Sequence, residues 1–380
     1  FWSPNINIFR DPRWGRGHET YGEDPYLTGQ IGTQFVKGLQ GNDSKYMKLI
    51  ATAKHFAVHS GPESERHFFN VNVNDRDLWE TYLPAFKDLI VDAKAYSVMG
   101  AYNRVNGESA SASKYLLQDI LRDKWGFKGY VVSDCGAIND IHANHKIVKT
   151  PAESAALGVI NGCDLNCGGI YQNNLSNSVK LGLINENEID TAVYRLFLAR
   201  MKLGMFDPAK IVSYAQIPFD INNSKKHDQL SLKTALNSMT LLKNEGALPI
   251  NINVIKKIAV VGPNADNINA LLGNYHGTPS NPITLINGLN SYVGKRPEIT
   301  YSKGVDLVKN GVESLNMLDD SVLDDVKKAD LAIFVGGLDA TWEGEEMPGG
   351  INVNGFYNGD RTKIELPEIQ QEAIRSMIKT

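Results

Sequence analysis

Cysteine is scarce in this chain, because its 380 residues include only Cys135, Cys163 and Cys167. Three cysteines are too few for a disulfide-built scaffold, although one local disulfide and a leftover thiol fit the sequence. Long apolar runs are also missing, and none reaches the roughly 18 residues of a membrane helix. No targeting signal is visible, and we expect the chain to be a fragment of a longer protein.

Neither charge sign dominates the sequence. Lys and Arg number 39, Asp and Glu number 43, and the formal net charge is −4. Without a basic excess, nucleic acid and anionic membranes are not expected partners. His142 and His145 lack a convergent third ligand, so no metal site is predicted. The glycine-rich turns 336–337 and 349–350 do not form a phosphate cradle, and no cofactor is expected.

Short apolar runs alternate with helical patterns over residues 1–207. This alternation predicts a parallel sheet. In the helical segment 75–91, Asp75 is the expected N-cap, and Pro84 is expected to kink or shorten the helix. The expected strands are 2–8, 50–56, 96–102, Tyr130–Ser133 and 163–166, and the other expected helices are 114–124 and 187–203.

Polar side chains gather directly after the expected strands. A (β/α)8 barrel builds its active site at the carboxyl ends of its strands, whereas an open sheet draws on fewer of them. The pattern therefore favours a barrel. These residues are Lys54, His55, Tyr102, Asn103, Ser133, Asp134, Asp164 and Asn166.

Periodicity is lost over residues 208–235, which we interpret as a linker. A second α/β pattern follows over 236–380, with apolar strands at 258–261 and 331–335. Both strands are apolar on both faces, as central parallel strands are. The chain is longer than the roughly 250 residues of a large single domain, so two domains are predicted.

Asp134 closes the buried strand Tyr130–Ser133. A carboxylate there would be exposed at a barrel mouth yet held rigidly, as a nucleophile that must approach an anomeric carbon requires. An Asp that caps the next helix would look the same. From this segment alone, the two interpretations carry equal weight.

Lys54 and His55 end another expected strand. Both could bind vicinal sugar hydroxyls. Alternatively, Lys54 could form a Schiff base in an aldolase-type barrel or a structural salt bridge. The loop 10–26 is dense in arginine, aromatic and acidic residues, which suits either a polyhydroxylated ligand or a structural ion-pair network.

The segment 342–346 reads Trp-Glu-Gly-Glu-Glu and follows the expected strand 331–335. Composition alone favours a solvated acidic loop. If the loop covered the barrel mouth, it would supply a general acid.

These motifs, in this order, resemble glycoside hydrolase family 3 over nearly the whole chain. Each motif alone is weak, but the ordered set is specific. It comprises Pro12-Arg13-Trp14-Gly15-Arg16, Lys54-His55-Phe56, Ala101-Tyr102-Asn103, Gly129 to Asp134, Gly262-Pro263-Asn264-Ala265-Asp266, Asp360-Arg361 and Leu366-Pro367.

The resemblance implies a barrel domain (1–207), a linker (208–235) and an α/β sandwich domain (236–380). It implies that the first barrel strand and the end of the sandwich lie outside this chain. It also implies a retaining, exo-acting β-glycosidase that releases terminal sugars from plant-type oligosaccharides, and a periplasmic or secreted location. The alternative is a non-catalytic carbohydrate-binding relative or an inactive fragment. A homodimer is one possible assembly, and the sequence does not give the oligomeric state.

By the same resemblance, Asp134 is the nucleophile, and Glu343 or Glu345 is the acid/base. Glu345 is favoured because it directly follows a glycine. Lys54 and His55 are expected to keep Asp134 ionised, while the acid needs a raised pKa. The residues expected around the sugar are Arg16, Lys54, His55, Arg66 and Tyr102.

The resemblance does not separate xylose from glucose specificity. The Cys135 and Cys167 segments look more like the β-xylosidase branch, in which cysteine replaces a bulky tryptophan after the nucleophile. We therefore expect a Cys135–Cys167 disulfide that narrows the sugar site.

Overall fold

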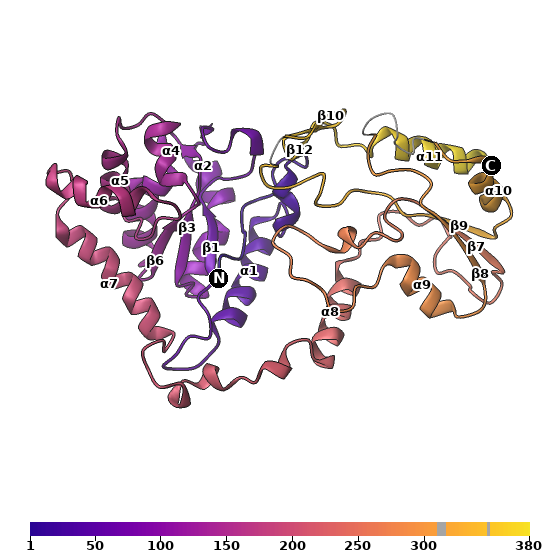
Figure 1. Ribbon diagram of the computed structural model, residues 1–380, viewed down its shortest axis with the longest axis horizontal. Coiled ribbons are helices and arrows are strands. Elements are labelled where there is room, and N and C mark those ends of the chain that lie inside the picture. Colours follow the sequence, from indigo (N-terminus) through magenta and orange to yellow (C-terminus); the bar gives the residue numbers. More distant parts are fainter. Residues whose placement is uncertain (310–316, 348–349) are drawn as a thin grey trace. The chain divides into compact units, whose positions relative to one another are not determined.

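The computed structural model describes residues 1–309, 317–347 and 350–380. It divides into two units, Phe1–Ile217 and Pro218–Thr380 (Figure 1). Each unit has its own parallel sheet with helices around it, which confirms the α/β class. Among the described residues, no helix is long and apolar enough to span a bilayer.

The sheet of the first unit consists of β1 (Thr52–Phe56), β3 (Ser97–Gly100) and β6 (Tyr130–Ser133), which are parallel and adjacent in chain order. Every side chain of β1 and β3 is buried, as expected for a parallel sheet covered on both faces. The expected strands 50–56, 96–102 and Tyr130–Ser133 are confirmed. The first two are shorter than predicted, and the third has the predicted bounds.

The expected strands 2–8 and 163–166 are each reduced to a single parallel bridge. Asn5 pairs with Lys54, and Leu165 pairs with Val132. Pro4 has no N–H to donate, which limits the hydrogen bonds that segment 2–8 can form with β1. The two bridges extend the order of the sheet at both ends, so five segments lie edge to edge in chain order.

The expected helix 75–91 forms, but in pieces. Asn74, not Asp75, is its N-cap, because the Asn74 side chain accepts from the Asp77 N–H. Wide π-type turns precede and follow the piece that begins at Pro84, since proline cannot continue a regular helical ladder. The pieces are α2 (Asp75–Asp77), η3 (Leu78–Tyr82), α3 (Pro84–Lys87) and η4 (Asp88–Asp92).

Other helices of the first unit surround the sheet in Figure 1. The expected helices 114–124 and 187–203 are confirmed as η6 and α7. The set is η1 (Gly15–Glu19), α1 (Pro25–Gln40), η6 (Tyr115–Lys124), α4 (Ala137–Ala143), α5 (Pro151–Ile160), α6 (Ile170–Lys180) and α7 (Glu186–Lys202).

The stretch 208–235, which we interpreted as a linker, contains the boundary between the two units at Ile217 and Pro218. It holds three short 3-10 turns and most of helix α8 (Lys225–Ser238). No residue of α8 is buried. A helix without a buried face needs no apolar stripe, so the loss of periodicity could not reveal it.

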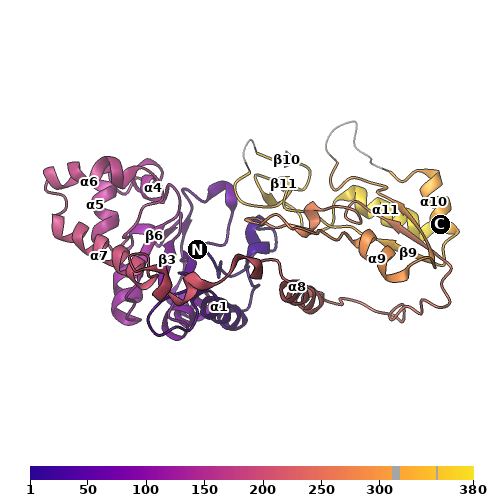
Figure 2. The same cartoon turned by 60° about the horizontal axis from the view of Figure 1, so that its bottom comes forward.

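In the second unit, β7 (Lys257–Val261) lies between β8 (Glu298–Ser302) and β9 (Leu331–Phe334), all parallel (Figure 1). Figure 2 shows β9 beside the helices of this unit. Alternate β7 residues face opposite sides, as the two-residue period of a strand requires. Ile258 and Val260 pack with helix α9 (Leu285–Val293). Ala259 and Val261 pack with helix α10 (Asp320–Lys327).

The strands 258–261 and 331–335 are confirmed, but β9 is not central. It ends the order β8–β7–β9, and none of its side chains is fully buried. The sequence missed β8 because Glu298, Thr300 and Tyr301 break the apolar run. The unit is completed by β10 (Asn352–Val353), β11 (Phe356–Tyr357), β12 (Asp360–Arg361) and α11 (Glu368–Lys379).

Candidate active site

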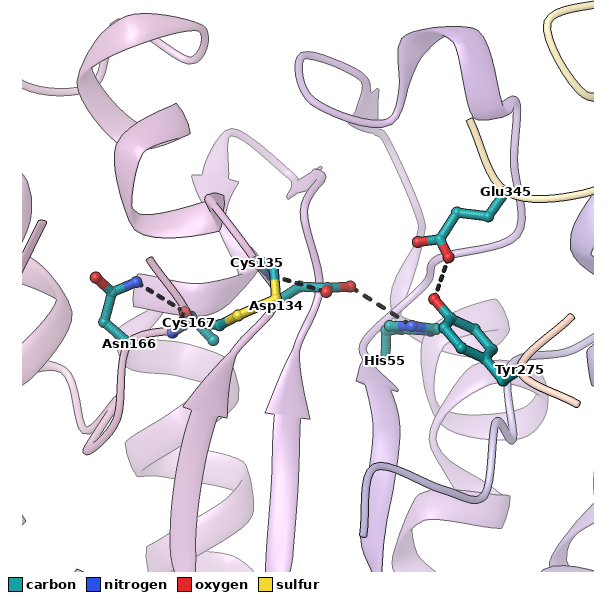
Figure 3. Close-up of a disulfide and its surroundings, with 8 residues drawn as sticks. His55, Asp134, Cys135, Asn166, Cys167, Tyr275 and Glu345 are labelled. Carbon is teal, nitrogen blue, oxygen red and sulfur yellow. Dashed lines mark hydrogen bonds and ion pairs between the residues drawn. A yellow bond between two sulfur atoms is a disulfide. The ribbon is translucent and has the colours of Figure 1, made fainter. Parts of the chain in front are cut away.

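Asp134 stands directly after β6 and is only 7% exposed. Its backbone N–H donates to the carbonyl of Gly100, at the end of β3, over 3.0 Å. Its Oδ1 accepts from the Cys135 N–H over 2.8 Å. In Figure 3 the carboxylate points towards the imidazole of His55, whose Nε2 lies 3.5 Å from Oδ2. The sheet thus holds this carboxylate at one defined place.

His55 is fixed by Asn7, whose side-chain N–H donates to the His55 carbonyl over 2.9 Å. The Asn7 oxygen accepts from the His55 backbone N–H over 2.8 Å and lies 2.9 Å from Nδ1. Nδ1 therefore carries the proton, because its partner is an acceptor. Nε2 faces the Arg16 guanidinium at 3.3 Å.

Burial holds the pKa of His55 well below its ordinary value, and the nearby cations Arg16 and Lys54 lower it further. His55 is therefore neutral at neutral pH, and its contact with Asp134 is not an ion pair. A neutral His55 adds no positive charge beside Asp134, and the expectation that His55 helps to keep Asp134 ionised stays a prediction.

Burial also raises the pKa of Asp134 above its ordinary value. The Cys135 N–H and the cations Arg16, Lys54 and Arg66 oppose that shift without cancelling it. These three cations do favour the ionised carboxylate, as the sequence predicted for Lys54. Desolvation is nevertheless the larger effect, because the group is almost completely enclosed.

Arg16 is fully buried and pairs with Glu19 through two hydrogen bonds of 3.0 and 2.9 Å. Asn5 donates to the same carboxylate over 3.2 Å. A planar guanidinium held by a bidentate carboxylate has little freedom to move. Of the two interpretations of loop 10–26, the ion-pair network is therefore present around Arg16.

Arg66 lies over the ring of Tyr102, 4.5 Å from its centroid. Glu63 accepts from Arg66 over 3.4 Å and from the indole N–H of Trp14 over 2.7 Å. The ring of His67 lies 4.6 Å from that of Tyr102 in an edge-to-face arrangement. These contacts fix Tyr102 and Arg66 beside one another.

Cys135 and Cys167 form a disulfide with a Cα–Cα distance of 4.4 Å, which confirms the expected bond (Figure 3). It joins the residue after Asp134 to the segment that pairs with β6. Cys163 is a buried free thiol.

Asp164 does not belong to this group. It accepts from Arg122 over 2.7 Å and from Arg195 over 2.8 Å, so it ties η6 and α7 to the sheet. Asn166 donates to the Ser133 hydroxyl over 3.2 Å. Both residues follow an expected strand, but their roles here are structural.

Glu343 and Glu345 lie in the second unit, between β9 and β10. Glu343 is 3.4 Å from Arg361, and burial raises its pKa although Arg361 opposes the shift. Glu345 accepts a hydrogen bond from the Tyr275 phenol. Each glutamate is thus anchored by a side chain of its own unit.

The structure gathers Arg16, Lys54, His55 and Arg66 around Asp134. Sequence reasoning missed Asn7, Glu19 and Glu63, which hold His55, Arg16 and Arg66, and His67, which packs against Tyr102. For Glu19 a signal existed, since it follows Arg16 by three residues. Within the described ranges, no cluster of three or more His, Cys, Asp or Glu could hold a metal ion.

Residues 1–199 match the Glycosyl hydrolase family 3 N terminal domain, and residues 239–380 match the Glycosyl hydrolase family 3 C-terminal domain. A xylan 1,4-beta-xylosidase of Xylanibacter ruminicola is 45% identical over 92% of this chain and 40% of its own length. Probable beta-D-xylosidase 7 of Arabidopsis thaliana is 38% identical over 99% of this chain and 48% of its own length.

Among solved structures, a GH3 exo-beta-xylosidase (XlnD) in complex with a xylobiose aziridine activity-based probe is 33% identical. It superposes with a TM-score of 0.90 over 100% of this chain and 47% of that one. A b-glucosidase from Erythrobacter marinus is 30% identical, with a TM-score of 0.87 over 100% of this chain and 52% of that one. This chain thus spans 40 to 48% of the length of the two curated relatives. The chain belongs to glycosyl hydrolase family 3.

Proposed function

We propose that this chain carries the catalytic residues of a retaining, exo-acting β-glycosidase that releases a terminal β-linked xylose or glucose. The observation that carries the proposal is the enclosure of Asp134. It is a rigid strand-end carboxylate with three cations and one neutral imidazole around it. The names of the xylosidase and glucosidase relatives support the same class of substrate.

The proposed architecture is a (β/α)8 barrel followed by an α/β sandwich. The chain order of β1, β3 and β6, extended at both ends by bridges, supports the barrel. Barrel enzymes place reactive residues at the carboxyl ends of their strands. Asp134, Lys54 and His55 occupy such positions on two strands.

In the first chemical step, Asp134 attacks the anomeric carbon and forms a covalent glycosyl–enzyme ester. Glu345 protonates the departing glycosidic oxygen as the bond breaks. This pairing requires the two carboxyl groups to be about 5 to 5.5 Å apart in the working enzyme. Arg16, Lys54, His55, Arg66 and Tyr102 are proposed to bind the hydroxyl groups of the sugar.

In the second step, water attacks the same carbon from the face that the leaving group vacated. Glu345 now accepts a proton from this water, and Asp134 leaves as a carboxylate. The two displacements together retain the anomeric configuration. The cations around Asp134 stabilise its charge when it is released.

Xylose is the proposed preference over glucose. Xylose lacks the exocyclic hydroxymethyl group of glucose, so its site needs less room. The Cys135–Cys167 disulfide fixes the residue directly after Asp134 and is proposed to narrow the sugar site there.

Hydrolysis of nitrophenyl β-xyloside and nitrophenyl β-glucoside by the full-length protein tests the proposal. Asp134→Ala should abolish turnover, with a loss of about 10⁴-fold or more, because no covalent intermediate can form. Asp119→Asn, an exposed aspartate of the same unit, is the matched control. Wild-type turnover by Asp134→Ala would overturn the proposal.

The choice between the two glutamates has its own test. Azide should restore turnover to Glu345→Ala, because a small anion can attack the glycosyl–enzyme without a general base. It should not rescue Glu343→Ala, in which Arg361 loses its partner and the loop loses an anchor. Rescue of Glu343→Ala alone would reverse the two roles.

A further inference from the structure

Loops at the carboxyl end of the second sheet line a solvent-open cavity of about 500 Å³. Its wall is formed by residues that follow β7, β8 and β9, together with Tyr301 of β8. Pockets that take small molecules have volumes of about 300 to 1,000 Å³. The cavity therefore has room for a small ligand.

The strand order places this cavity at a topological switch point of the sheet. The chain passes from β7 through α9 to β8, then returns past β7 through α10 to β9. Because α9 and α10 pack on opposite faces, the connections diverge at the carboxyl ends of β7 and β9. In open α/β sheets, ligands bind in the crevice at such a switch point.

The cavity residues Asn267, Asp339 and Thr341 belong to a preorganised polar network. Asp339 is 8% exposed and accepts from the Asn267 side chain over 2.8 Å and from the Thr341 backbone N–H over 2.9 Å. Asn264 donates to the Gly336 carbonyl over 3.3 Å. These bonds tie the loop after β7 to the loop after β9, so the cavity does not need a ligand to hold its shape.

The lining selects a neutral, hydroxyl-rich molecule. Tyr301 and Trp342 offer aromatic surface, and the acidic side chains are Asp266, Asp306 and Asp339. Among the described lining residues, Lys303 is the one lysine, and it pairs with Asp306. Three carboxylates against one lysine disfavour phosphate or another anion. Among the described residues, the acids do not converge into a metal site.

We propose that this cavity, whose described lining comes from the second unit alone, is a second saccharide site that takes one or two neutral pyranose rings. The choice of a β-linked pentose disaccharide as ligand rests on the proposed function. The preference for a neutral polyol rests on the cavity alone. Since Trp342 directly precedes Glu343, an occupant would contact the start of the loop that carries Glu343 and Glu345.

The chain itself supplies a reporter, because Trp342 is the only one of its 5 tryptophans that lies in the second unit. The full-length protein with Asp134→Asn, labelled with 5-fluorotryptophan, would be titrated with xylobiose and followed by ¹⁹F NMR. The Trp342 resonance, assigned with Trp342→Phe, should shift saturably. Tyr301→Ala should weaken this binding by about tenfold, because it removes one aromatic wall.

Two controls make the result decisive. Tyr292→Ala changes an 81% exposed tyrosine of α9 that does not line the cavity, and should bind as before. Tyr301→Phe keeps the ring and should bind within a few-fold, which separates loss of the wall from loss of the fold. Lys54→Ala weakens the proposed barrel site and should leave the Trp342 shift in place.

The inference is overturned if the Trp342 resonance does not respond, if Tyr301→Ala leaves the response unchanged, or if Lys54→Ala abolishes it. These outcomes are independent of hydrolysis. A protein that hydrolyses xylosides without a Trp342 response refutes only the second site. A Trp342 response in a protein without turnover refutes only the proposed function.

Discussion

Asp134, the proposed nucleophile, carries an energetic cost because its carboxylate is buried. Because burial raises its pKa, the folded protein binds a proton at Asp134 more tightly than the unfolded chain does. The stability that this group contributes is therefore greatest at low pH. It falls as the pH rises from the ordinary value of 3.8 to the folded-state pKa, and stays low above it.

Asp134→Asn removes the buried charge and should raise the melting temperature at pH 7. The gain should shrink at pH 3.8, because the raised pKa keeps Asp134 of the wild type mostly protonated there. Thermal unfolding at both pH values measures the difference, with Asp119→Asn as the control at an exposed site. A lower melting temperature of Asp134→Asn at pH 7 would show that the three nearby cations outweigh desolvation.

Glu19 is the residue through which Arg16 is positioned. Glu19→Gln keeps the shape but leaves the buried Arg16 without its bidentate partner, which should cost about 3 to 5 kcal/mol of stability. Misplacement of Arg16 should also lower kcat/KM by up to about 100-fold. Steady-state kinetics on nitrophenyl β-xyloside and thermal unfolding check both effects.

The Arg13–Asp11 pair provides the comparison, because its side chains are 52% and 44% exposed. Asp11→Asn should change stability by less than about 1 kcal/mol. If Glu19→Gln and Asp11→Asn changed stability and kcat/KM equally, Glu19 would not be the residue that positions Arg16.

At the scale of the element, the disulfide joins two segments at the end of β6 across a sequence separation of 32 residues. The double variant Cys135→Ala, Cys167→Ala should lose about 3 to 4 kcal/mol, as loop-closure entropy predicts. If the bond narrows the sugar site, the ratio of β-glucosidase to β-xylosidase activity should rise.

Cys163→Ser is the matched control, because it changes the buried thiol and leaves the disulfide intact. Its glucoside-to-xyloside ratio should equal that of the wild type. An unchanged ratio in the double variant would confine the disulfide to a role in stability.

The apolar sequence pattern predicted the elements whose side chains are buried. It missed the elements whose side chains are exposed. β1, β3, β6 and β7 were predictable because nearly all their side chains are enclosed. Helix α8 has no buried residue, and β8 is half-exposed. Contacts between distant segments were also out of reach, such as Asn7 with His55 at a separation of 48 residues. No local pattern records them.

At the scale of the whole molecule, the proposed nucleophile and the proposed acid belong to different units, Phe1–Ile217 and Pro218–Thr380. The roles of nucleophile and acid should therefore be distinguishable by comparing substrates with poor and good leaving groups. Bond cleavage with a poor leaving group needs protonation by Glu345, whereas a dinitrophenolate departs without help. Attack by Asp134 is required for both kinds of substrate.

Glu345→Ala should accordingly lower kcat/KM for xylobiose by about 10²- to 10⁴-fold, the usual range for general acid catalysis. The loss with dinitrophenyl β-xyloside should be much smaller. In the presence of azide, the product should be the β-configured xylosyl azide, because two displacements retain configuration. Asp134→Ala should lose activity on xylobiose and on dinitrophenyl β-xyloside to the same extent. An α-configured azide, or equal losses for both substrates in Glu345→Ala, would contradict the division of roles between the two units.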